Sequence, residues 1–189
     1  MIHALRQRLP NYVLRELGKA MPEAAVLMPF TDEPDPHLIL TVRSAHMSAH
    51  AGEVAFPGGK RDPGDIDLLD TALRESEEEV GLNRKEVEVL AELSPLASRL
   101  GMKVTPFVGL VAPDVALVAE PGEVDEIFRV PLSFFLNTPP ELTQKFTFLG
   151  RTMRMPSYDF EGRRIWGLTA FMILDVLNHA YDTNISVED

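Results

Sequence analysis

A glycine turn followed by a glutamate-bearing helix restricts the fold of this chain more than any other part of its sequence. The turn covers residues 56–59, and the helix predicted after it covers residues 67–80. Asp65 or Asp67 can cap the start of this helix by accepting a backbone hydrogen bond, and Gly81 can end it in the left-handed conformation. The sequence therefore predicts a helix with defined ends, placed shortly after a tight turn.

Three glutamates of this helix point to metal chemistry. Glu75, Glu78 and Glu79 stand three and four positions apart, so their carboxylates share one helix face. An acidic run alone is also typical of a solvated helix face, but like charges this close repel one another without a cation between them. Carboxylate oxygens suit Mg²⁺ or Mn²⁺, which keep waters and accept phosphate oxygens. The face therefore indicates a divalent metal site that acts on phosphates.

The stretch from the turn to Leu82 resembles the Nudix box, G-x5-E-x7-R-E-U-x-E-E-x-G-U, in which U is an aliphatic residue. The matching positions are Gly59, Arg74, Glu75, Glu78, Glu79, Gly81 and Leu82. Two positions depart from the pattern. Asp65 replaces the first glutamate and is separated from Arg74 by eight residues instead of seven, and Ser76 takes the first aliphatic position. The longer turn leaves Asp65 without an assigned function.

This resemblance implies an α/β protein with the Nudix fold: a mixed β-sheet sandwiched between helices, with the box as a loop-helix-loop. Of the 189 residues, 45% are hydrophobic, which suffices for one core. We expect a single domain over residues 1–189, with residues 1–20 as an N-terminal helical extension. The strands expected are 24–30, 38–43, 87–93 and 104–111, followed by an acidic loop over 113–126, a helical turn over 131–136, a hairpin over 158–166 and a helix over 168–181.

The resemblance also implies roles for the residues of the box. Glu75 and Glu79 would be the principal metal ligands, Glu78 a further ligand, and the Gly59 carbonyl a backbone ligand. Arg74 would orient the glutamates through charge-assisted hydrogen bonds. Bound Mg²⁺ or Mn²⁺ would bridge diphosphate oxygens and activate a water for in-line attack at phosphorus. The chain is thus expected to be a pyrophosphohydrolase.

The general base is expected either in the box or in the later acidic segment. That segment supplies the candidates Glu120, Glu123, Asp125 and Glu126. We favour Glu123, although such a cluster is also typical of a solvated loop.

A second resemblance concerns the substrate. Residues 40–44 and 52–59 are similar to the signature of coenzyme A diphosphatases, LLTxR[SA]xxxRxxxGxxxFPGG, except that Ser48 replaces its second arginine. Residues 128–136 and 165–170 are further likenesses. A guanidinium grips phosphate oxygens at two points, so Arg43 is a candidate for the 3′-phosphate of coenzyme A. The cations that can replace the one missing at Ser48 are His50, Arg61, Arg99 and Lys103. The expected products are 4′-phosphopantetheine and adenosine 3′,5′-bisphosphate.

Two other functions stay open at this point. The same helix can hydrolyse ADP-ribose, NADH or another nucleoside diphosphate derivative, and Ser48 motivates that alternative. A Nudix-fold module that binds a nucleotide without cleaving it is the alternative from another class, although the intact glutamates argue against it.

Charge and composition bound the partners. The net charge of −11 disfavours nucleic acid, whose binding depends on Lys and Arg contacts to phosphate. The sequence contains no apolar run long enough to predict a membrane span. The absence of cysteine is compatible with the reducing cytoplasm, where we expect the protein. The apolar N-terminal helix suggests a homodimer.

Overall fold

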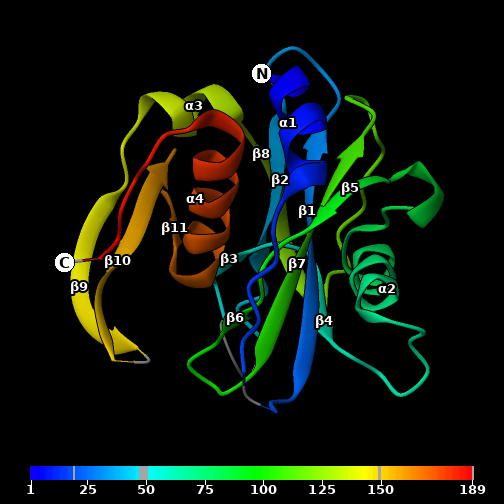
Figure 1. Ribbon diagram of the computed structural model, residues 1–189. Coiled ribbons are helices and arrows are strands. Elements are labelled where there is room, and N and C mark those ends of the chain that lie inside the picture. Colours follow the sequence, from blue (N-terminus) through cyan, green and yellow to red (C-terminus); the bar gives the residue numbers. More distant parts are fainter. Residues whose placement is uncertain (19, 47–50, 149, 189) are drawn as a thin grey trace.

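The computed structural model describes residues 1–18, 20–46, 51–148 and 150–188 (Figure 1). Its main sheet is mixed, because β1 (Glu23–Thr31) runs parallel to β7 (Lys103–Val111) while the neighbouring pairs are antiparallel. The other strands of this sheet are β2 (His37–Arg43), β3 (Val54–Ala55), β4 (Gly58–Lys60), β5 (Glu88–Glu92), β6 (Leu96–Ala97) and β8 (Val124–Pro131). The expected mixed α/β fold is confirmed.

Helices cover both faces of the main sheet (Figure 1). Helix α2 (Leu68–Val80) lies on one face, and α1 (Ile2–Arg8) and α4 (Gly167–Tyr181) lie on the other. A second sheet of β9 (Glu141–Phe148), β10 (Arg151–Phe160) and β11 (Arg163–Trp166) packs against α4. The short helical elements are η1 (Leu9–Asn11), η2 (Arg84–Glu86) and α3 (Leu132–Asn137). None of the helices in the described residues is long and apolar enough to cross a membrane.

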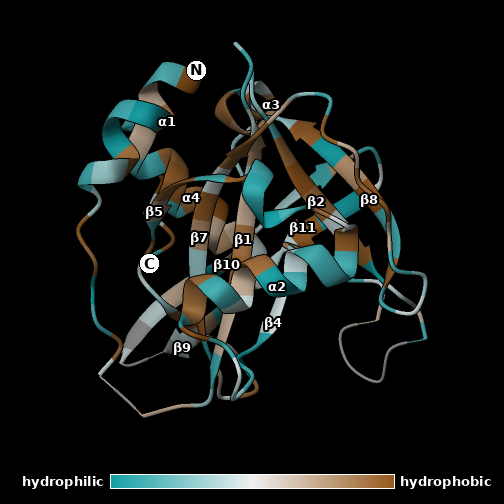
Figure 2. Ribbon diagram, turned by 90° about the vertical axis from the view of Figure 1, so that its right-hand side faces the viewer, coloured by the Kyte–Doolittle hydropathy of each residue, from teal (hydrophilic) through white to brown (hydrophobic). Residues whose placement is uncertain are grey.

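Strand β1 shows why the sheet is sandwiched. Its successive side chains alternate between the two faces. Leu27 belongs to the apolar cluster under α2, whereas Met28 and Phe30 belong to the larger cluster that includes α4. All three are at most 1% exposed. In Figure 2, β1 and β2 carry mainly hydrophobic residues where they run behind α2. The sheet is therefore buried on both sides, and α2 is held against it.

The ends of α2 are fixed by the residues that the sequence indicated. The Asp67 side chain accepts a hydrogen bond from the Asp70 backbone N–H at 2.8 Å. Gly81 has a φ of 66°, and its N–H bonds back to the last turn of the helix. This left-handed conformation favours glycine. Of the two proposed caps, Asp67 is the one that caps the helix.

Several strands were not predicted from the sequence, and β8 and β9 are the longest of them. The predicted loop over 113–126 ends earlier, because β8 begins at Val124 and pairs with β2 up to Pro131. Its alternation is concealed by the charged Asp125, Glu126 and Arg129. Strand β9 was also missed, and it is formed by pairing with β10 along an edge rather than by burial in the main core. The other predicted strands, the hairpin over 158–166 and the helix over 168–181 are confirmed within a few residues.

The N-terminal extension is helical over a shorter range than the predicted residues 1–20. Helix α1 and η1 together end at Asn11, where Pro10 removes a backbone donor. Leu5 and Leu9 are fully buried in the main apolar cluster, and Arg6 forms ion pairs with side chains of the same chain. The apolar face on which a homodimer was expected is thus covered by the chain itself. A homodimer stays a prediction that needs another surface.

Candidate active site

Strand β4 lies directly against the glutamate face of α2. The Gly58 backbone N–H donates to Glu79 Oε2 at 3.0 Å. A Cβ atom at Gly59 would lie 2.4 Å from the Glu75 carboxyl carbon, and one at Gly58 would lie 2.4 Å from the Ala25 carbonyl oxygen. Only glycine permits so close an approach of backbone to carboxylate. The two glycines of the turn are therefore required for the contact between β4 and α2.

Glu79 is the most deeply buried glutamate of the three. Its side chain is 3% exposed and lies 3.4 Å from Arg43 Nη1, at the end of β2. Burial, together with the neighbouring charges of Glu75 and Glu123, raises its pKa to about 7, although the Gly58 N–H and Arg43 act in the opposite direction. The buried carboxylate therefore has fewer compensating partners than its negative charge requires.

Glu75 and Glu78 share one arginine. Arg74 Nη1 donates to Glu75 Oε1 at 3.0 Å and to Glu78 Oε2 at 3.1 Å. Burial raises the pKa of Glu75 although Arg74 lowers it, and the charges of Glu78 and Glu123 add to the increase. The Glu78 side chain is 59% exposed. The three carboxylates thus lie on one face, graded from the buried Glu79 to the open Glu78.

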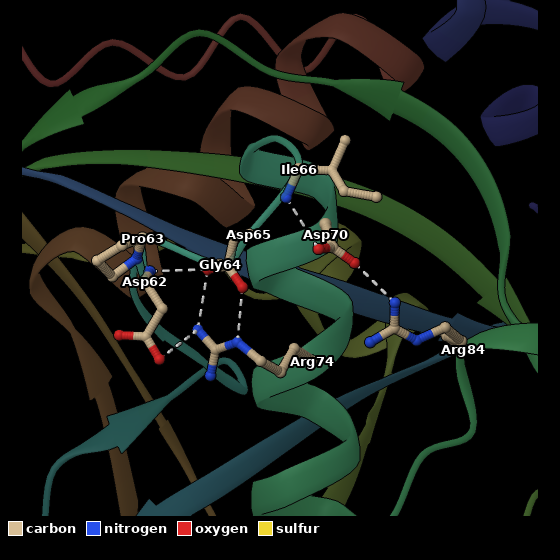
Figure 3. Close-up of a pocket in the computed structure, with 8 residues that line it drawn as sticks. All are labelled: Asp62, Pro63, Gly64, Asp65, Ile66, Asp70, Arg74 and Arg84. Carbon is tan, nitrogen blue, oxygen red and sulfur yellow. Dashed lines mark hydrogen bonds and ion pairs between the residues drawn. The ribbon is translucent and has the colours of Figure 1, made fainter.

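Arg74 is itself held by Asp65, as Figure 3 shows. Its Nε and Nη2 donate to the two Asp65 oxygens at 2.8 and 3.0 Å. Asp65 also accepts hydrogen bonds from the Thr71 hydroxyl and the Asp62 N–H, each at 2.8 Å. The Arg74 guanidinium holds the pKa of Asp65 well below its usual range, and Asp65 raises the pKa of Arg74. The longer turn brings the shorter aspartate to the arginine, so Asp65 has the positioning role that its spacing concealed.

The later acidic segment is attached to the C-terminal end of α2. The Val118 N–H donates to the Val80 carbonyl, and the Glu120 N–H donates to the Glu79 carbonyl, each at 2.9 Å. These backbone bonds use carbonyl groups that the last helical turn leaves free. The segment that leads to Glu123 therefore starts beside the glutamate face.

Glu123 is the candidate base whose charge has the clearest effect on the glutamates of α2. Its charge raises the pKa of both Glu75 and Glu79. Its carbonyl accepts a hydrogen bond from the Ser44 N–H at 2.8 Å, which ties it to the residue after Arg43. The Glu123 residue is exposed, so its carboxylate is accessible to water.

The other three candidate acids have different contacts. Asp125 accepts a hydrogen bond from the Ala45 N–H at 2.9 Å. Glu126 forms an ion pair with Arg163 of β11 at 2.6 Å. Glu120 attaches to α2 through its backbone and accepts a long hydrogen bond from the Gly122 N–H. Only Glu123 among the four is a source of the raised pKa at both Glu75 and Glu79.

The two arginines predicted to bind substrate lie in different places. Arg43 is at the glutamate centre, beside Glu79. Arg61 follows β4 and forms an ion pair with Glu23 at 3.0 Å, and Lys103 binds the same carboxylate at 2.8 Å. Ser48 and His50 lie outside the described residues. The predicted residues thus form one centre around α2 and a second, basic group near Glu23.

The glutamate centre fits a divalent metal ion by the chemistry of its donors. It offers carboxylate oxygens of like charge, which hard cations such as Mg²⁺ prefer. The raised pKa of Glu79 reflects its burial and, to a smaller extent, the charges of Glu75 and Glu123, and a bound cation would favour the ionised form. Within the described residues no three acidic or histidine side chains already converge on one point. The hydrogen bonds from Arg74 and Gly58 hold the carboxylates in this arrangement.

Comparison with known proteins agrees with this geometry. The model of the NUDIX domain matches residues 21–148, more than half of the chain. A relative from Photorhabdus laumondii, described as an uncharacterized Nudix hydrolase NudL, is 47% identical over 79% of this chain and 80% of its own. The corresponding protein of Yersinia enterocolitica is 45% identical over 79% and 77%. The chain therefore belongs to the Nudix family, and it is a pyrophosphohydrolase.

A solved structure of similar fold carries a nucleotide-derived ligand. The NUDIX domain of Shewanella oneidensis NrtR, complexed with ADP ribose, superimposes with a TM-score of 0.50 and 25% identity. The match covers 64% of this chain and 79% of that one. Members of the family generally use divalent metal ions, and the donor set described above fits that requirement.

Proposed function

We propose that this chain hydrolyses the diphosphate bond of coenzyme A or an acyl-coenzyme A, with Mg²⁺ or Mn²⁺ as cofactor. The products would be 4′-phosphopantetheine and adenosine 3′,5′-bisphosphate. Water adds to one phosphorus, and the bridging oxygen leaves with the other phosphate. The observation that carries the chemistry is the buried Glu79, which contacts the Gly58 N–H and Arg43 and shares its helix face with Glu75.

Each residue of the centre has a distinct role in this proposal. Glu75, Glu78, Glu79 and the Gly59 carbonyl would hold the metal. Arg74 orients Glu75 and Glu78 through the hydrogen bonds described above. A bound divalent ion would neutralise diphosphate oxygens and lower the pKa of the attacking water.

Two side chains outside the helix complete the proposed mechanism. Glu123 would accept the proton of the attacking water, because it is an exposed carboxylate in the segment that starts beside the glutamate face. Arg43 would bind the diphosphate, because its guanidinium lies within 3.4 Å of Glu79. In the proposal Arg43 therefore contacts the scissile group, and the 3′-phosphate needs other cations.

The choice of coenzyme A is supported by sequence. Residues 40–44 and 52–59 follow the coenzyme A diphosphatase signature except at Ser48. The first segment contains Arg43 and the second ends at Gly59, and both of these residues lie against the glutamates. The signature thus belongs to the centre itself and not to a distant surface.

ADP-ribose is the second candidate substrate. It is favoured by the likeness to the NUDIX domain that was solved in complex with ADP ribose. NADH contains the same type of diphosphate bond and belongs to the same test. A binding module without turnover is the alternative of another class.

Product analysis of the purified protein tests these candidates. Coenzyme A, ADP-ribose and NADH are each incubated with Mg²⁺, Mn²⁺ or EDTA, and products are identified by mass spectrometry. We expect 4′-phosphopantetheine from coenzyme A only when metal is present. Turnover of ADP-ribose or NADH alone would reject the coenzyme A proposal, and tight binding of all three without product would favour the binding module.

A further inference from the structure

A second concave surface begins one residue beyond Gly59. It lies where β4 ends and where β1 and β7 begin, at the lower ends of these strands in Figure 1. We call it the β4-end hollow; its volume is about 670 Å³. The residues that line it are Met21, Pro22, Glu23, Lys60, Arg61, Leu100 and Met102. The hollow is therefore separate from Glu79, and its lining residue Lys60 follows Gly59 directly in β4.

The hollow carries an excess of positive charge on an otherwise acidic protein. Arg61 and Lys103 both bind the single carboxylate of Glu23, at 3.0 and 2.8 Å. Lys60 is exposed, and its ammonium forms no ion pair within the part of the chain that the structure describes. Two cations thus share the Glu23 carboxylate and Lys60 adds a third positive charge, on a chain whose net charge is −11. This local excess favours an anionic ligand group.

The rest of the lining is apolar. Met21 and Met102 contribute flexible thioether side chains, and Leu100 is 69% exposed. Methionine adapts its shape and packs well against aromatic rings. A ligand with a flat ring next to an anionic group would therefore contact both parts of the hollow.

The hollow and the glutamate centre lie a short distance apart along the chain of β4. Consecutive residues of a strand rise by about 3.3 Å, so the Arg61 Cα lies roughly 7 Å from that of Gly59. Arg74 Nη2 donates to the Lys60 carbonyl at 3.2 Å, which fixes the intervening backbone. In coenzyme A the 3′-phosphate is attached to the ribose that carries the 5′-diphosphate. A diphosphate at Gly59 would leave that 3′-phosphate within reach of long cationic side chains.

We infer that the β4-end hollow binds the adenosine 3′-phosphate end of the substrate. Lys60, Arg61 and Lys103 contact the 3′-phosphate, and Met21 and Met102 contact the adenine. The inference rests on the proposed function, because only a substrate with a 3′-phosphate uses these cations fully. It also identifies the cations that serve in place of the arginine that the signature has at Ser48.

The test compares coenzyme A with 3′-dephospho-coenzyme A, which differ only in the phosphate at issue. Lys60→Ala is expected to raise the KM for coenzyme A about tenfold and to leave that for dephospho-coenzyme A unchanged, because a charge-assisted contact is lost. The matched control is Lys85→Ala, which removes one exposed positive charge on η2, outside the hollow. An equal change for both substrates, or none for either, would overturn the inference.

A binding measurement keeps this test independent of turnover. Calorimetry with adenosine 3′,5′-bisphosphate and with AMP measures the 3′-phosphate contribution directly. We expect wild type to prefer the bisphosphate and Lys60→Ala to lose that preference. If wild type cleaves neither coenzyme, the proposed function fails. The calorimetry then still shows whether the hollow binds the 3′-phosphate. Equal affinity of wild type for the two nucleotides would reject the inference that the hollow binds the 3′-phosphate.

Discussion

Asp65 and Glu79 stand before and within the same helix, and the side chain of each is 3% exposed. Equal burial has opposite consequences for the two carboxylates. Asp65 accepts two hydrogen bonds from Arg74 and further ones from Thr71 and Asp62, and its pKa is held well below the usual range. Glu79 accepts one backbone hydrogen bond and a long contact from Arg43, and its pKa rises to about 7.

The difference lies in how completely each charge is compensated. Hydrogen bonds to the ionised form stabilise a buried carboxylate, whereas desolvation and like charges destabilise it. Asp65 is a structural group because the protein itself supplies its counter-charge. Glu79 is compensated less completely, by the Gly58 N–H and a 3.4 Å contact with Arg43, and it faces the charges of Glu75 and Glu123. Uncompensated buried charge of this kind is typical of functional sites.

Replacing Glu79 is expected to give the largest effect on activity. Glu79→Gln keeps the shape of the side chain but removes the charge that binds the cation. We expect turnover to fall by roughly 10³-fold, equivalent to about 4 kcal/mol of transition-state stabilisation, with an intact fold. Glu77→Gln is the matched control, because Glu77 binds Arg84 outside the centre. Near-normal steady-state rates for Glu79→Gln would contradict the distinction between Glu79 as a functional group and Asp65 as a structural one.

Replacing Glu123 tests the general base. Glu123→Gln is expected to lower kcat by about 10²-fold with little change in KM, because proton transfer typically contributes that much. Glu126→Gln and Asp125→Asn are controls from the same segment, because Glu126 pairs with Arg163 and Asp125 accepts a hydrogen bond from the Ala45 N–H. Rate measurements over substrate concentration distinguish the three. A larger loss in either control would assign the base elsewhere.

Replacing Asp65 sharpens the other side of the comparison. Asp65→Asn leaves Arg74 partly buried without its bidentate partner, so the free energy of unfolding is expected to fall by about 3 kcal/mol. Denaturant unfolding at pH 7 measures the change. Asp62→Asn is the control, because Asp62 is 68% exposed and 3.9 Å from Arg74, and its effect is expected to stay below about 1 kcal/mol. Equal changes in the two variants would show that Asp65 has no special structural role.

The local features of the fold were predictable because neighbouring residues determine them. Asp67 and Gly81 define the ends of α2, and the alternation in β1 places it between two apolar layers. Strand β8 was missed because it depends on pairing with β2, which is distant in sequence. The β-propensity of single residues contains little information about pairing between strands that are distant in sequence.

The candidate site, like the fold, could be predicted from the sequence only in part. Helical spacing was enough to group Glu75, Glu78 and Glu79. The role of Asp65 was hidden, because its spacing from Arg74 departs from the box and only the folded turn brings the two together. The β4-end hollow was equally hard to predict, since Lys60 and Lys103 come from strands distant in sequence that both pair with β1 in the folded sheet.

The most direct test of the central difference is the pH dependence of unfolding in EDTA, for wild type and Glu79→Gln. The pKa of Glu79 is raised from 4.5 to about 7, so between these values the folded state binds more protons than the unfolded state. Wild type is therefore expected to lose up to about 3 kcal/mol of stability as the pH rises from 4.5 to 8. Asp65 does not contribute in this range, because its lowered pKa affects stability only at more acidic pH. We predict a clearly flatter profile for Glu79→Gln; identical slopes for the two proteins would contradict the account of Glu79 as an uncompensated buried charge.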